Sequence, residues 1–138
     1  MGRLLAIDYG EKRIGLAHTD ELQLIASPLE TVAIKDVFNF LFDYFEQESV
    51  DSIIVGDPKT LNNKPAEISK KIKLFTDKLK TLFDKPIYFV DERFTSKMAL
   101  KTMVMVNTSQ KQRRQKKDID KISAALILQT YLDRKYKT

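Results

Sequence analysis

The chain has 138 residues, of which 43% are hydrophobic and 31% charged, so it carries enough apolar side chains for one packed core and does not have the composition of a disordered protein. It contains no cysteine, which excludes disulfides and thiolate metal sites, and no apolar run approaches the roughly 20 residues that a membrane span requires. The formal net charge of +5 favours polyanionic partners. We therefore expect a single domain over residues 1–138 and, because no segment resembles a targeting signal, a cytoplasmic location.

The beginning of the chain predicts three strands. Apolar runs at residues 4–7 and 14–17 flank a short turn that contains Gly10, which is the pattern of an antiparallel hairpin. Asp8 follows the first run, at the inner end of this hairpin. A third strand is expected to include residues 27–32.

From Val37 onward the pattern alternates between helices and strands, as in α/β proteins. Apolar residues spaced by three and four positions between Val37 and Phe45 predict an amphipathic helix, and the same spacing predicts another over residues 68–82. The β-branched run at residues 51–56 predicts a buried parallel strand between these two helices.

The last third of the chain predicts one more strand, over residues 86–93, which ends in charged residues. Residues 95–105 are expected to be helical. Residues 107–118 are polar, strongly basic and without an apolar period, so they are expected to form an exposed, mobile loop. A final helix is expected from Asp118, with Asp120 near its start.

Three positions combine a carboxylate with a strand end or a helix start. They are Asp8, the pair Asp91 and Glu92, and Asp120. A carboxylate directly after a buried strand is costly unless it is paired, hydrogen-bonded or bound to a metal. The carboxyl ends of parallel strands open on one crevice, and three oxygen ligands without histidine or cysteine suit Mg²⁺ or Mn²⁺. The pattern therefore indicates phosphoryl-transfer chemistry.

Each of these residues also has a simpler interpretation. Asp8 can cap the hairpin turn, Asp120 can be a helix-start charge favoured by the macrodipole, and Arg93 can neutralise its neighbours. His18, the only histidine, is interpreted as a hairpin residue rather than a general base, because no orienting partner lies near it in the sequence. The basic stretch can be a solvated segment, and only its position before Asp120 favours contact with phosphates.

Four segments in order resemble the YqgF (RuvX) family of RNase H-like proteins, which are related to Holliday junction resolvases. The resemblance covers nearly the whole chain and rests on the segments GRLLAIDYGEKRIGLA, VGDP, FVDERFTS and DKISAALILQTYLD. It implies an RNase H-like α/β fold, in which a mixed five-stranded sheet has its first three strands antiparallel and helices on both faces. The loop after Gly56 departs from the family pattern, at Asp57 and in the segment LNNKPAE.

The resemblance also implies a metal-dependent nuclease that matures the 5′ end of the 16S ribosomal RNA precursor. Asp8, Glu92 and Asp120 carry over as catalytic and metal-binding residues, with two Mg²⁺ or Mn²⁺ ions when substrate is bound; Asp91 and Asp118 are possible additional acids. The basic residues expected to contact nucleic acid are Lys12, Arg13, Arg93, Lys111, Arg113, Arg114, Lys116 and Lys117.

Other functions compete with this interpretation. An Asp-x-Gly hairpin also occurs in actin-like and sugar-kinase ATPases, but those proteins close two such domains around ATP, and this chain has neither that length nor a Gly-rich phosphate loop. A DNA endonuclease of the junction-resolving type, or a nucleic-acid-binding module without turnover, would use the same residues. The sequence leaves open whether RNA or DNA is cut, whether cleavage is endonucleolytic, and whether the protein is a monomer or a homodimer.

Overall fold

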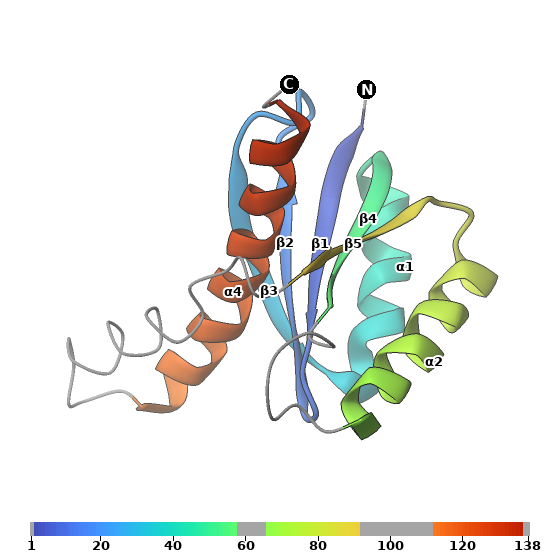
Figure 1. Ribbon diagram of the computed structural model, residues 1–138, viewed down its shortest axis with the longest axis vertical. Helices are drawn as coiled ribbons and strands as arrows, with labels where there is room; N and C mark the ends of the chain where they lie inside the picture. The colour runs from blue at the N-terminus through green and yellow to red at the C-terminus, as the bar shows by residue number, and fades with distance from the viewer. Residues whose placement is uncertain (1, 58–65, 92–111, 137–138) are drawn as a thin grey trace.

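A five-stranded sheet lies between two layers of helices in the computed structural model of the protein (Figure 1). The structure describes residues 2–57, 66–91 and 112–136, and their side chains except at residues 66 and 112–118. The strand order is β3-β2-β1-β4-β5, with α1 and α2 on one face of the sheet and α4 on the other (Figure 1). The predicted α/β architecture with helices on both faces is therefore confirmed.

The first three strands form an antiparallel meander. β1 (Arg3–Tyr9) pairs with β2 (Arg13–Thr19), and β2 pairs with β3 (Ala26–Ala33). The turn between β1 and β2 is closed by the backbone N–H of Gly10, which donates to the carbonyl of Arg13 at 3.0 Å. All three predicted strands are confirmed, and each extends beyond its apolar run.

The remaining two strands run parallel to β1. β4 (Val50–Asp57) pairs with β1, and β5 (Ile87–Asp91) pairs with β4. The crossovers are made by α1 (Val37–Gln47), which follows a short 3₁₀ turn, and α2 (Ala66–Leu82). The carboxyl ends of β1, β4 and β5 therefore lie at the same end of the sheet, as the sequence predicted.

Alternating side chains of β1 fill two separate cores. Leu5 and Ile7 point toward α1 and α2, where they pack in one cluster with Leu41 and Leu79. Leu4 and Ala6 point the other way. They pack in a second cluster under α4, whose members from that helix are Ala124, Ile127, Leu128 and Leu132. Burying a leucine side chain stabilises a fold by about 1.5–3 kcal/mol, so β1, buried on both faces, holds the two layers together.

The helix α4 (Gln112–Lys135) begins earlier than predicted. Residues 112–118 form its first two turns, so the expectation of a loop there is wrong. Gln, Arg and Lys are good helix formers, so a run of these residues can form a helix without an apolar period. Residues 107–111 and the helix predicted over residues 95–105 lie outside the described parts of the chain. Among the described helices, none is long and apolar enough to cross a membrane.

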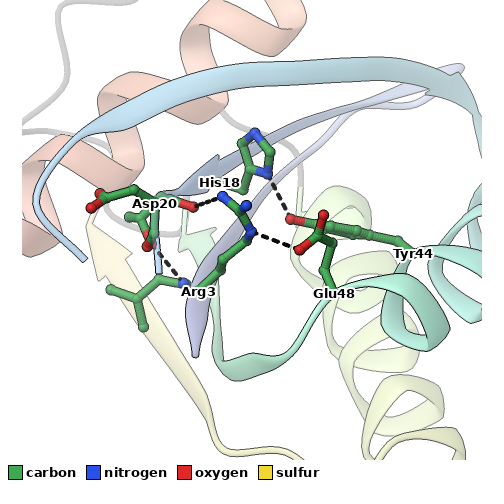
Figure 2. Close-up of polar contacts among 7 residues, drawn as sticks. Arg3, His18, Asp20, Tyr44 and Glu48 are labelled. Carbon is green, nitrogen blue, oxygen red and sulfur yellow. Dashed lines mark hydrogen bonds and ion pairs between the residues drawn. The ribbon is translucent and has the colours of Figure 1, made fainter. Parts of the chain in front are cut away.

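A polar network joins β1, β2 and α1 at the far end of the sheet from the β1–β2 turn (Figure 2). The Arg3 guanidinium pairs with the Glu48 carboxylate, Nε to Oε2, at 3.0 Å, and donates through Nη1 to the Thr19 carbonyl at 2.8 Å. Beside this ion pair, His18 Nδ1 lies 2.6 Å from the Tyr44 hydroxyl (Figure 2). His18 therefore faces α1.

Burial sets the protonation of this histidine and tyrosine pair. Burial raises the pKa of Tyr44 to about 12, so its hydroxyl stays protonated near neutral pH. Burial, followed by the positive charge of Arg3, lowers the pKa of His18 below its usual value. The imidazole is therefore held in its neutral form.

The His18 and Tyr44 pair predicts that the protein becomes less stable as the pH decreases. Because the folded pKa of His18 is lower than the unfolded value of about 6.5, the unfolded chain binds more protons as the pH drops below that value. We expect the free energy of unfolding of the wild type to fall more steeply than that of His18→Gln between pH 7.5 and 5, measured by urea denaturation. Equal slopes for the two proteins would contradict the assignment.

Candidate active site

Asp8 points to the face of the sheet that α4 covers. It lies within β1, directly opposite Gly15 of β2, and residues directly opposite each other in an antiparallel pair project to the same face. A Cβ atom added to Gly15 would overlap with the backbone carbonyl oxygen of Asp120. The backbone of α4 therefore lies against β2 at the level of Asp8, and the structure brings Asp8 and Asp120 together.

An ion pair holds Asp120 at this place. Arg13 lies two residues before Gly15, on the same face, and its Nε is 2.9 Å from Oδ2 of Asp120. Both side chains are partly exposed, at 37% and 24% respectively. An ion pair with this exposure stabilises the fold only weakly, by about 0–1 kcal/mol, so its main effect is to orient the Asp120 carboxylate. Arg13 is a predicted nucleic-acid contact that the structure places beside a predicted catalytic acid.

The position of Asp120 in α4 changes its interpretation. The helix begins at Gln112, so Asp120 lies about two turns inside it. The helix macrodipole acts within the first turn, so the interpretation of Asp120 as a helix-start charge is wrong. The position of Asp120 is instead explained by the face of the sheet that α4 covers, where Asp120 contacts Gly15 and Arg13.

Asp8 is buried, with 3% of its surface exposed, and glycines flank it on both sides. On β2 its neighbour is Gly15. On β4 the register that pairs Ile7 with Val55 places Gly56 beside it. Neither of these two neighbours has a side chain, and on the β2 side the backbone of Asp120 lies against Gly15. A carboxylate that is buried between two glycines requires hydrogen-bond donors or cations as partners.

The alternation of β5 separates Asp91 from this site. Val90 packs in the core under α4, and the ring of Tyr88 stacks on that of Tyr131 of α4 with centroids 5.9 Å apart. Asp91 therefore points to the opposite face, where its register partner is Asp57. The structure does not bring Asp91 to the face of the sheet on which Asp8 and Asp120 lie.

The other predicted site residues fall into two groups. Glu92, Arg93 and Lys111 lie outside the described residues. The backbones of Arg113, Arg114, Lys116, Lys117 and Asp118 belong to the first two turns of α4. Lys12 is exposed in the turn between β1 and β2. This turn, the first turns of α4 and the start of α2 lie at the same end of the sheet (Figure 1).

The donor set that the structure brings together fits a hard divalent cation. Asp8 and Asp120 offer carboxylate oxygens only, and Mg²⁺ binds through one or two carboxylates while it keeps several waters for exchange with substrate phosphates. Within the described part of the chain, no group of three histidine, cysteine, aspartate or glutamate side chains could hold a metal.

Gly15 is the residue of the candidate site that the sequence interpretation does not identify. A glycine inside a strand pattern indicates a bulge or a close backbone approach, and that signal was present in the segment RIGLA. It did not indicate which part of the chain approaches. That partner is α4, far away in the sequence, and only the tertiary structure identifies it.

Gly15→Ala should displace α4. The new methyl group would overlap with backbone atoms of Asp120, and backbone cannot yield as the tip of a side chain can. We expect the substitution to lower the free energy of unfolding by about 1–3 kcal/mol or more, measured by urea denaturation. Unchanged stability would show that α4 does not lie against Gly15.

The strand order of the mixed sheet is that of an RNase H-like fold. One acid lies on the central strand β1 and another on the last helix, α4. The structure is similar to that of T. thermophilus RuvC in complex with a Holliday junction substrate. The TM-score is 0.59 at 15% sequence identity, over 96% of this chain and 95% of the other. At this identity the similarity establishes the fold alone.

The chain belongs to the family described as RuvX: Holliday junction resolvase, whose pattern matches residues 2–134. A relative from Flavobacterium psychrophilum is 49% identical over 136 residues, which are 98% of this chain and 99% of that protein. A relative from Bacteroides fragilis is 46% identical over the same shares of the two chains. Both carry the name "Putative pre-16S rRNA nuclease". The family membership predicted from the sequence is confirmed.

Proposed function

We propose that this protein is a divalent-metal-dependent nuclease that hydrolyses phosphodiester bonds during 5′ maturation of the 16S ribosomal RNA precursor in the cytoplasm. The observation that carries the proposal is the packing of Asp120 against Gly15, directly opposite the buried Asp8. The names of the relatives at 46–49% identity support ribosomal RNA as the substrate. The net charge of +5 suits a polyanionic substrate.

In this proposal Asp8 and Asp120 hold the metal ions, and Glu92 is the third ligand. Glu92 is preferred to Asp91 because Asp91 points to the other face of the sheet. Bound ions would supply Lewis-acid chemistry and activate a water molecule for in-line attack, leaving a 5′-phosphate and a 3′-hydroxyl. Asp8 contributes a carboxyl group that is buried near the carboxyl end of β1.

The remaining groups orient the site rather than move protons. Arg13 balances the charge of Asp120 and, with Lys12 in the adjacent turn, places positive charge where a substrate phosphate would enter. His18 faces α1, on the opposite face of the sheet from Asp8, so it is not the general base of this site. His18 is the only histidine of the chain, so no histidine acts as the general acid or base of cleavage in this proposal.

Asp8→Asn tests the nuclease proposal. The substitution keeps the shape of the side chain but removes its ligand charge, so cleavage should fall at least 100-fold, or about 2.7 kcal/mol of barrier, while RNA binding persists. The measurement is release of the 5′ extension from a 16S precursor RNA in Mg²⁺, in Mn²⁺ and in EDTA. Asp43→Asn, at an exposed acid of α1, is the matched control and should cleave normally.

Two outcomes would contradict the metal nuclease. One is cleavage by Asp8→Asn at the wild-type rate, and the other is equal cleavage by the wild type in EDTA. If neither protein cleaves any substrate while both bind nucleic acid, the function is that of a binding module without turnover.

A junction-resolving DNA endonuclease is the second candidate, favoured by the description of the family itself. Junction resolution requires two symmetric cuts and therefore a dimer, whereas trimming of an RNA end requires one active site. A labelled four-way DNA junction assayed beside the precursor RNA, together with the mass of the protein in solution, distinguishes the two candidates.

We also expect the basic first turns of α4 to hold the substrate backbone. They carry Arg113, Arg114, Lys116 and Lys117. Neutralising Arg113 and Lys117 with glutamine should weaken binding to all sequences alike, and should reduce the slope of log affinity against log salt by roughly 0.7–0.9 for each phosphate that the protein no longer binds. The measurement is a salt titration of RNA binding in EDTA. An unchanged slope would show that these side chains do not bind phosphates.

A further inference from the structure

The exposed side of α2 is strongly basic. Five of its lysines are exposed to solvent, and we refer to them as the α2 lysine face: Lys70, Lys71, Lys73, Lys78 and Lys80. The same side carries only two acids, Glu67 and Asp77. The sequence interpretation treated this helix only as a crossover that fills the core.

The neighbouring helix on the same face of the sheet has the opposite charge. α1 contains no lysine or arginine, and its exposed charged residues are Asp43 and Glu46. Of the two helices on this face of the sheet, only α2 carries positive charge. It is also the helix that begins at the end of the sheet where Asp8 lies (Figure 1).

The lysines of this face form no ion pairs with the acids that the structure describes. Lys78 places its Nζ over the ring of Phe38, 4.5 Å from the centroid. Their ammonium groups remain available to an external anion. Leu74, 69% exposed between them, adds an apolar contact but no charge.

The α2 lysine face starts at the same end of the sheet as the candidate active site, on the opposite face of the sheet, and leads away from that end. α2 follows β4, whose carboxyl end lies beside Asp8, and its first turn lies at the same end of the sheet as the β1–β2 turn (Figure 1). Its 17 residues extend over about 25 Å. Nucleic acid that crosses this end of the sheet from the first turns of α4 would meet Lys70, Lys71 and Lys73 on the other side.

The composition of the face indicates which form of nucleic acid it fits. Single strands are bound through aromatic side chains on which bases stack, and the exposed side of α2 carries no aromatic residue. Phe75, the one aromatic within the helix, is buried in the core. Lysines without aromatics fit the phosphates of a double helix, whose bases are already stacked.

We propose that the α2 lysine face is a second nucleic-acid contact, which holds a double-helical RNA stem next to the cleavage site by its phosphates. The inference rests on the proposed nuclease function for the identity of the polyanion. It assigns to α2 a binding role that is separate from the acids and from the basic first turns of α4.

The test compares two variants with the same net charge. Lys70→Gln/Lys73→Gln removes two positive charges from α2, and Asn39→Asp/Gln47→Glu adds two negative charges at exposed positions of α1. The probes are an RNA hairpin with a single-stranded 5′ tail, and the tail alone, titrated with salt in EDTA. The α2 variant should bind the hairpin roughly fivefold or more weakly, with a salt slope reduced by roughly 1 to 2, while its binding to the tail alone stays as in the wild type. The α1 variant should bind both probes as the wild type does.

The possible results separate this inference from the nuclease proposal. Equal weakening by both variants would mean that only net charge matters, and equal weakening on both probes would mean that no stem is recognised; either result overturns the inference. A wild type that binds neither probe overturns both proposals. Wild-type binding with the expected α2 effect, but without cleavage in Mg²⁺, supports the α2 contact and overturns the nuclease.

Discussion

The contact between Gly15 and the backbone of Asp120 is the constraint on which the rest of the site depends. Because glycine has no Cβ, α4 can lie directly against β2, closer than any side chain would allow. That approach places Asp120 beside the buried Asp8, within reach of Arg13, in a space that glycines keep open. Without this approach, Asp120 would lie farther from Asp8.

A second attachment fixes the other end of α4. Gln23, in the turn between β2 and β3, is 1% exposed, and its backbone φ of 59° lies in the left-handed region. Its side-chain amide donates to the Gly2 carbonyl at 2.7 Å and accepts from Nζ of Lys135 at 2.8 Å, while its backbone carbonyl accepts from the Tyr136 hydroxyl at 3.0 Å. The left-handed conformation is uncommon for a residue other than glycine, and the buried hydrogen bonds offset its cost. With Gly15 near one end and Gln23 near the other, α4 has little freedom to tilt on the sheet.

Acidic and basic side chains gather in different parts of the fold. The candidate catalytic acids lie between α4 and the sheet, and the other face of the sheet carries an acidic α1 next to a basic α2. The partly buried His18 and the buried Tyr44 form a pair toward the opposite end of the sheet, where they join β2 to α1. An anionic polymer would therefore meet positive charge around the catalytic end and negative charge along α1, which orients it before any specific contact forms.

The sequence by itself determined the features that depend on local periodicity. Alternating and helical apolar patterns, together with the four motifs, predicted the mixed sheet, the family and the acids Asp8 and Asp120 as candidates. It failed at residues 112–118, which form helix although the segment has no apolar period. Only the tertiary structure decided that Asp91 faces away from Asp8, that Asp120 lies well inside its helix, and that Gly15 is the point of contact. These features depend on strand register and on the approach of segments distant in the chain, and no local pattern encodes them.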